Sequence, residues 1–285
     1  MNDFAHQQHV CKSCSNTFVG LYCNLCGEKV IEPKERKIQS VIGHLLVAST
    51  IVDNKFLKSL WYTVTKPGFL SREYVDGRRV MYMRPLQMFF ILNLIYFLFP
   101  VLQMFNSSLY TQLHVLPHSK LAQRIVVQML KKDSMTMTGF ELMYNEKTTS
   151  LAKLLVVVFV LLASLPLSLI FRKKNRYFTD HVAFSVELTS FNLAVNAIAL
   201  SVIFAFINMI LRITHTSSYG MYLNDLTLTI IFVSTNLYFI FYAARTFYSQ
   251  RGKRLILKAF AGILGLFVAL EVYRFFLFFI TIWTM

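Results

Sequence analysis

Long runs of apolar residues are the feature that most limits what this chain can fold into. Five stretches are apolar over enough length to cross a hydrocarbon core of about 30 Å, which takes roughly 20 helical residues. They run over residues 86–105, 151–171, 183–211, 226–242 and 259–283. The fourth is the weakest because Ser234, Thr235 and Asn236 interrupt it. The sequence therefore predicts an all-α fold, a polytopic transmembrane helix bundle of about five spans.

The composition fits the same interpretation. Hydrophobic residues make up 55% of the chain and charged residues only 15%, a balance that differs from that of ordinary soluble domains. The formal net charge of +15 belongs to the segments between the apolar runs, because charges are excluded from hydrocarbon. Enrichment of Lys and Arg in cytosolic loops explains this excess, so no nucleic-acid partner is expected.

The distribution of Lys and Arg predicts an orientation. These residues number 12 before the first span, 4 between the second and third, and 5 between the fourth and fifth. If the spans alternate in direction, these 21 residues share one side, against 7 on the other. The positive-inside rule then places the N-terminus in the cytosol and the C-terminus outside. The first residues lack an apolar signal core, so no cleaved signal peptide is expected.

The strongest local motif is a pair of CxxC knuckles. Cys11 and Cys14 form the first, and Cys23 and Cys26 form the second after eight intervening residues. Four thiolates at this spacing can close a tetrahedral zinc site with bonds of about 2.3 Å, and Gly27 relieves the tight turn. A closed shell of four thiolates leaves no coordination position for a substrate, so the motif predicts a structural Zn²⁺ in a small zinc ribbon. Rubredoxin-like iron or a redox pair is the alternative.

Amphipathic helices are expected outside the spans. Residues 38–52 carry apolar side chains at helical spacing. A second helix should begin after Asp53 as N-cap and stop at Pro67, with an apolar face formed by Phe56, Leu57, Leu60, Trp61 and Val64. These two helices can lie in the headgroup plane or pack on the bundle, and the sequence leaves both possibilities open. Another such helix is expected at residues 121–130, within an exported loop at 106–150.

A basic turn precedes the first span. Clustered Arg side chains next to a membrane face gain about 1 kcal/mol each from anionic headgroups. The density of Gly, Pro and Tyr in this segment also predicts a defined turn rather than a loose tether. The candidate lipid-contacting residues are Gly77, Arg78, Arg79 and Arg84.

A polar stripe runs along the third span. At 100° per residue, one sector of roughly 80° contains His181, Ser185, Thr189, Asn192 and Asn196. Glu187 points nearly to the opposite side of the same helix. Hydrogen bonding between helices is the simpler explanation of the stripe. The alternative is a hydrated cavity or polar ligand site that opens to the cytosol, with His181 at its mouth.

The fifth span carries an acidic and a basic residue near the expected middle of the membrane. Glu271 and Arg274 are three positions apart, so an ion pair between them would lower the cost of burying either charge. Structural pairing is the simpler explanation, and a proton or ion pathway is the alternative. Gly262, Gly265 and Ala269 form an edge of small residues on this helix, which predicts close helix packing.

Five short segments together resemble a bacterial family of uncharacterised membrane proteins that combine a short zinc ribbon with several spans. They are CKSC, YCNLCGE at 22–28, PGFLSREYVDGRRVMYMRP at 67–85, LPLSLIFRK at 165–173 and YFTDHVAFSVELTSF at 177–191. The resemblance implies a multipass protein of the bacterial inner membrane. It also implies a His near position 181 and usually a second polar residue, most often His, near position 187. Glu stands at 187 here, which weakens any histidine metal pair, and the two side chains diverge by about 120° on a helix.

These features predict three regions and no assigned reaction. The regions are a cytosolic zinc ribbon with linker at 1–37, interfacial helices and the basic turn at 38–84, and a transmembrane domain at 85–285. Recognisable catalytic motifs are missing from the sequence, so no catalytic residue is assigned and an enzyme is not favoured. The leading hypothesis is a non-catalytic membrane adaptor or sensor that contacts anionic lipid headgroups and uses its zinc ribbon to engage a cytosolic protein. The alternatives are a transporter or lipid-handling protein that uses the polar stripe, and a membrane enzyme that acts on lipid headgroups.

Overall fold

The chain forms two compact units, Met1–Asn54 and Lys55–Met285, and each is described by itself. The structure is a computed structural model that describes residues 7–11, 14–26, 54–78, 81–98, 105–133, 135–172, 176–213 and 225–285. The helix predicted at 38–52 and the residues Gly27 and Arg79 lie outside these described residues.

The first unit is built around a short β-hairpin. Strand β1 (Gln8–Val10) pairs antiparallel with β2 (Thr17–Val19), and His9 lies opposite Phe18. Because side chains alternate between the two faces of a strand, Phe18 points inward while Thr17 and Val19 are exposed. Phe18 is buried with Cys11 and Cys23. This core is very small, so the hairpin by itself has little apolar burial to stabilise it.

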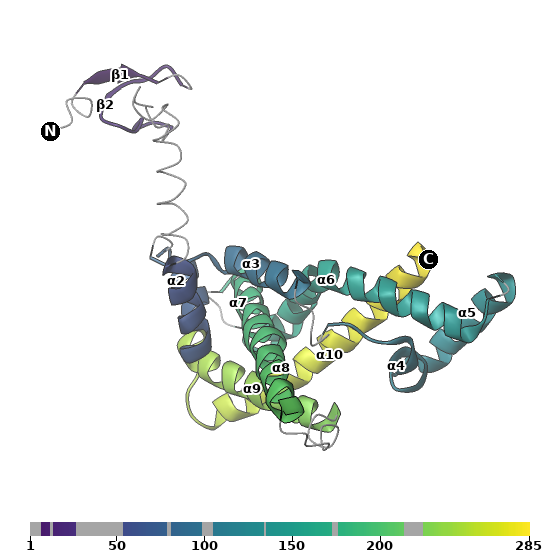
Figure 1. Cartoon of the computed structure of the whole chain (residues 1–285). Helices are drawn as coiled ribbons and strands as arrows, with labels where there is room; N and C mark the ends of the chain where they lie inside the picture. Colours follow the sequence, from purple (N-terminus) through teal and green to yellow (C-terminus); the bar gives the residue numbers. More distant parts are fainter. Residues whose placement is uncertain are drawn as a thin grey trace. The chain divides into compact units, whose positions relative to one another are not determined.

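The second unit is a bundle of helices (Figure 1). It comprises a helix at residues 54–65, α2 (Phe69–Val75), α3 (Pro85–Leu98), α4 (Leu109–His114), α5 (Ser119–Asp133), α6 (Met137–Ile170), α7 (Phe178–Phe191), the π-helical segment η3 (Asn192–Ala199), α8 (Leu200–Ile213), α9 (Asp225–Thr246) and α10 (Lys253–Thr284). The described residues of this unit contain no strand. The predicted all-α membrane fold is confirmed.

Four continuous helices are long and apolar enough to cross a membrane. They are Met137–Ile170, Phe178–Ile207, Thr227–Thr246 and Lys253–Thr284, which correspond to the last four predicted spans. The first predicted span, 86–105, is represented by α3, an apolar helix of 14 residues. At 1.5 Å per residue α3 is shorter than a hydrocarbon core, and residues 99–104 lie outside the described part of the chain.

Most of the predicted exported loop is helical. The helix expected at 121–130 is present as α5, with Ala122 and Val126 buried. α6 begins at Met137, well before the predicted span at residue 151, because the Thr136 side chain accepts a hydrogen bond from the Gly139 N–H and caps the helix. A satellite core joins α4, α5, the start of α6 and the end of α10.

The helix at 54–65 packs on the bundle with part of its predicted apolar face. Ser59 and Thr63 are fully buried, and Ser59 Oγ accepts a hydrogen bond of 2.8 Å from the Met83 N–H. By contrast, Leu57 and Trp61, which lie one turn apart, are 62% and 67% exposed. The helix therefore has a face toward the protein and an apolar ridge that points outward.

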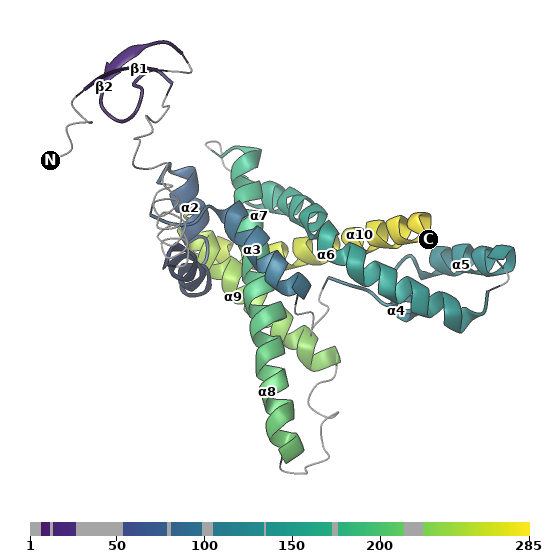
Figure 2. The ribbon, with the colours of Figure 1, turned by 45° about the horizontal axis from the view of Figure 1, so that its top comes forward.

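Helix α10 packs on α6 and α9, while α7 packs on α3 and α6 (Figure 2). The predicted small-residue edge of α10 lies at this contact. A Cβ added to Gly265 would stand 2.7 Å from the Cβ of Pro166, whereas one added to Gly262 would stand 3.2 Å from Ile240 Cγ2. The missing side chain at Gly265 is therefore what permits the close approach of α10 to α6.

Replacing Gly265 by Ala is expected to lower the free energy of unfolding by about 1 to 2 kcal/mol, because the overpacked methyl group outweighs the better helix propensity of Ala. The less crowded Gly262→Ala is the matched comparison and should change stability by less than Gly265→Ala. Thermal unfolding of the purified protein in detergent measures both. An equal effect at the two positions would show that Pro166 does not limit the packing.

Candidate metal centre and the polar interior of the bundle

The four cysteines lie together in the first unit. Their four sulfur atoms are all within 4.8 Å of one another, and none of the cysteines forms a disulfide. Cys11 Sγ lies 3.4 Å from Cys26 Sγ, and Cys14 Sγ lies 3.6 Å from Cys23 Sγ. Metal–sulfur bonds of about 2.3 Å in a tetrahedron require sulfur atoms roughly 3.8 Å apart. The four thiols can therefore hold one metal ion after small adjustments.

Backbone hydrogen bonds shape the knuckles and favour the thiolate form that binds a cation. The Cys11 N–H donates to Asn16 O at 2.8 Å, and the Ser15 N–H donates back to Cys11 O at 2.9 Å. Ser15 has a φ of +59°, which closes the turn between the first knuckle and β2. The backbone N–H of Cys26, followed by that of Leu25, lowers the pKa of the Cys23 thiol to about 6. A thiolate at this position favours metal binding.

Glu187 binds the turn that precedes α2. The N–H of Gly68 donates to Oε1 at 3.0 Å and the N–H of Ser71 donates to Oε2 at 2.7 Å, and Ser71 Oγ donates to the same Oε2. Gly68 has a φ of +78°, and a Cβ there would lie 3.0 Å from the Cα of Ala243. Pro67 and Gly68 thus place the free N–H groups of α2 against a buried carboxylate.

The arrangement explains why Glu187 stands apart from the polar stripe. Glu187 faces α2, whereas the stripe faces α6 and α9. His181 is likewise engaged inside the protein, since its Nδ1 lies 2.8 Å from the Tyr248 hydroxyl and its ring stacks on Tyr248. Glu187 and His181 therefore have separate partners, as their angular separation on the helix requires.

The polar stripe is hydrogen-bonded within the bundle. Ser185 Oγ donates to Val160 O on α6 at 2.7 Å, and Thr189 Oγ1 donates to Ser185 O at 2.8 Å. Further along, Asn192 Nδ2 donates to Asn236 Oδ1 at 2.9 Å, and Asn196 Nδ2 donates to Asn192 Oδ1 at 2.8 Å.

Asn236 and Thr235 complete this network from α9. Asn236 Nδ2 donates back to Asn192 Oδ1 at 2.8 Å, and Thr235 Oγ1 donates to Asn196 Oδ1 at 3.0 Å. In the sequence, these residues stand out only as interruptions of the fourth predicted span. Their polarity was the available signal, because polar groups inside a span pair with polar groups on a neighbouring helix. The network begins where the helix widens into the π-helical segment η3.

Glu271 and Arg274 form the predicted pair, with Arg274 NH1 3.1 Å from Glu271 Oε1. Nearby on α10, the Tyr273 hydroxyl donates to Ala152 O at 3.1 Å. Ala152 lies at the N-terminal end of the apolar run predicted at 151–171. Glu271 and Arg274 therefore lie near that end of the run. Gln112 and His118, which lie near the pair, were not predicted from the sequence because they come from the segment expected to be a loop.

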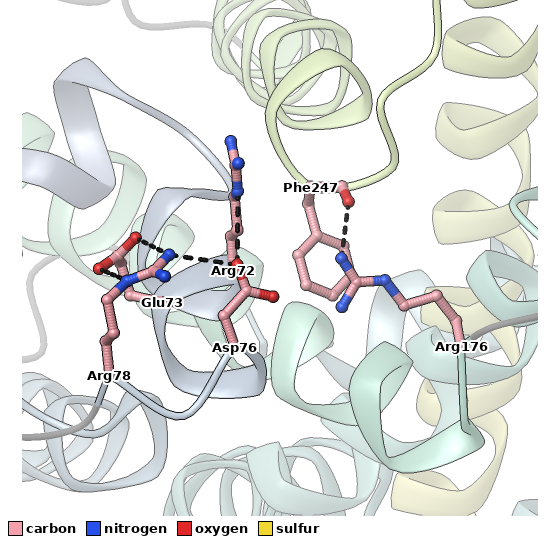
Figure 3. A network of polar contacts seen from close by, with 6 residues as sticks. All are labelled: Arg72, Glu73, Asp76, Arg78, Arg176 and Phe247. Atoms are coloured by element: carbon pink, nitrogen blue, oxygen red, sulfur yellow. Dashed lines mark hydrogen bonds and ion pairs between the residues drawn. The ribbon is translucent and has the colours of Figure 1, made fainter.

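The basic turn before α3 is an ordered ion-pair network (Figure 3). Arg78 donates to both carboxylate oxygens of Glu73, at 2.7 and 2.6 Å, and to Asp76 at 3.1 Å. The Arg78 hydrogen bond lowers the pKa of Glu73. Gly77 has a φ of +89°, which allows the chain to reverse here. Arg78 is thus held by protein carboxylates, although its side chain is exposed, as is that of Arg84.

The comparisons with known proteins match one part of the chain. A family model described as "Protein of unknown function (DUF3667)" matches residues 53–97. This range covers the helix at 54–65, the Pro67-Gly68 turn, α2 and nearly all of α3. No curated protein and no solved structure matches the chain. The chain is thus similar to a family of unknown function over this segment, and it also carries four membrane-length helices and a four-cysteine cluster.

Proposed function

We propose that this chain is a non-catalytic membrane adaptor of the bacterial inner membrane, in which a zinc-bound four-cysteine unit engages a cytosolic protein. Zn²⁺ is the proposed ion because four thiolates with no other ligand suit a closed tetrahedral site. The ion would stabilise the unit and take no part in a reaction. The observation that carries the proposal is the amount of apolar surface that this small unit exposes.

Four large apolar side chains of the first unit are mostly exposed. Val10 and Val19 lie on the same face of the hairpin, at 66% and 64% exposure, and Tyr22 and Leu25 beside the second knuckle are 61% and 72% exposed. Among residues 7–11 and 14–26 of the unit, the buried apolar side chains are Phe18 and two cysteines. These described residues expose more large apolar side chains than they bury, which is typical of an interaction surface.

The interior of the bundle supports an adaptor more than a transporter or an enzyme. Each stripe residue, His181, Ser185, Thr189, Asn192 and Asn196, has a hydrogen-bond partner within the protein. A permeation pathway would need such groups to face water. His181 is buried against Tyr248, which also disfavours a role in headgroup chemistry.

The basic segments lie together at one end of the bundle, which supports a cytosolic N-terminus. Arg176 donates to Phe247 O at 3.2 Å, and Lys258 lies over the ring of Phe171. Gly68 packs against Ala243 at the same end of the bundle. The segments before the first span, after the second and after the fourth thus meet at one end, which the positive-inside rule assigns to the cytosol.

A photo-crosslinking side chain placed at Val19 or Tyr22 is expected to trap one cytosolic protein in living cells. The same probe at the exposed polar Gln7 is the matched control and should trap much less of it. Adducts should also disappear when Cys11 and Cys26 are replaced by Ser, because the surface depends on the folded unit. Crosslinks to lipid alone would favour a membrane-surface role, and a partner from outside the cytosol would contradict the orientation.

A further inference from the structure

Buried polar groups without a protein partner gather at one junction. Among the described residues, six buried side-chain atoms have no hydrogen-bond partner, and five of them belong to α6, to α10 or to the segment just before α4. Helix α6 packs on both α4 and α10. They are Ser107 Oγ, Tyr144 OH, Thr148 Oγ1, Glu271 Oε2 and Arg274 Nε. Buried polar groups are normally hydrogen-bonded, so five such atoms in one region indicate a specific arrangement.

The junction is enclosed by the satellite core. Gln112 of α4 is fully buried, and its Nε2 donates to Arg274 O at 3.4 Å while its Oε1 lies 2.7 Å from His118 Nε2. Phe278 covers the other side, with its ring 6.0 Å from the rings of both Tyr144 and His118. α4 is thereby fixed over α6 and α10.

Two hydroxyl groups face the junction from α6. Tyr144 and Thr148 lie one turn apart and both are fully buried. The Tyr144 hydroxyl is directed toward Thr148 and Gln112, but the geometry completes no hydrogen bond to either residue. Ser107 approaches from the segment before α4, which is tied to α6 because Asn145 Oδ1 accepts a hydrogen bond of 2.9 Å from the Leu109 N–H.

The junction carries no net charge. Glu271 and Arg274 neutralise each other through one oxygen and one nitrogen, which leaves Oε2 as an unused acceptor and Nε–H as an unused donor. Because Gln112 Oε1 can only accept, His118 donates from Nε2, and burial lowers the pKa of the His118 ring. Unused donors and acceptors are thus present together without an unbalanced charge.

We propose that this junction is a binding site for a small uncharged molecule that both donates and accepts hydrogen bonds. Such a molecule satisfies the two α6 hydroxyls together with the free edges of the Glu271–Arg274 pair. Bound water and a small polar solute, such as a polyol or an amide, share this chemistry. The site is independent of the cysteine unit and of its proposed partner.

Removing the hydroxyls tests the proposal by the sign of the effect. A hydroxyl that truly has no partner is unfavourable, so Tyr144→Phe and Thr148→Val would then raise the unfolding midpoint. If the hydroxyls hold a bound molecule, each substitution should instead lower the midpoint, by roughly 2 to 4 °C. The two effects should also be non-additive, since both hydroxyls bind the same molecule.

Tyr273→Phe is the matched control, because it removes a hydroxyl on the same helix pair that already bonds to Ala152 O. It should lower the midpoint by a similar amount without coupling to Tyr144→Phe. Native mass spectrometry of the detergent-solubilised protein then separates the two sources: an added mass that Tyr144→Phe removes indicates a solute, and no added mass indicates water. A midpoint that rises or stays unchanged in both α6 variants would overturn the proposal.

Discussion

Replacing Cys11 and Cys26 together by Ser should abolish metal binding and leave residues 7–26 without a stable fold. The described residues of this segment bury Phe18 and two cysteines, an apolar burial too small to hold the segment folded by itself. Structural zinc typically contributes on the order of 10 kcal/mol to the folding of so small a unit. The effect should therefore be a complete loss of structure in this region and not a partial weakening.

Elemental analysis of the purified protein should find about one zinc per chain in the natural sequence and almost none in the double variant. Hydrogen exchange should show the backbone of residues 8–19 losing its protection while that of α6 and α10 is retained. His9→Gln is a useful control, since His9 packs on Phe18 and is not one of the four clustered ligands. Full metal content in the cysteine variant, or loss of metal in the His9 variant, would refute the four-cysteine shell.

Glu187→Leu should destabilise the bundle by about 3 kcal/mol or more. The substitution leaves the buried N–H groups of Gly68 and Ser71 without acceptors, and a hydrogen bond to a charged group contributes roughly 1.5 to 3 kcal/mol. Glu187→Gln keeps the volume and one carbonyl oxygen, so it should cost less, about 1 to 2 kcal/mol. Unfolding in detergent measures both changes.

The loss of structure in Glu187→Leu should begin at a specific place in the bundle. Hydrogen exchange should increase first at residues 67–76, because these residues contain the backbone groups that Glu187 accepts from. Glu146→Gln on α6 is the matched control, since Glu146 is exposed and should change stability by no more than about 0.5 kcal/mol. If Glu187→Leu were as mild as Glu146→Gln, the carboxylate would not hold α2.

The membrane architecture was predictable because it depends on local sequence. Each apolar run carries its own signal, and the cost of burying charges in hydrocarbon determines where the run ends. The same holds for the cysteine cluster, because Cys11 to Cys26 lie within one short segment and the knuckle spacing sets their geometry. Helix α5 was also foreseen from its own periodicity.

What the sequence did not predict depends on contacts between distant segments. The partner of Glu187 lies 116 to 119 positions earlier in the chain, and nothing in the third span identifies the Pro67-Gly68 turn as its target. Gln112 and Tyr144 were missed for a related reason. They lie in a segment expected to be a loop, and they become notable only because α4 closes over α6 and α10.

The bond between Glu187 and the Gly68 turn also bears on biosynthesis. Ribosomes deliver the chain from its N-terminus, so α2 and α3 leave the exit tunnel long before residue 187 does. Until then, the backbone amides of Gly68 and Ser71 lack their carboxylate and must stay hydrated at the membrane surface. The Pro67-Gly68 turn can therefore reach its final structure only after the helix that carries Glu187 has entered the bilayer. Insertion of that helix is thus the step that completes the N-terminal half of the bundle.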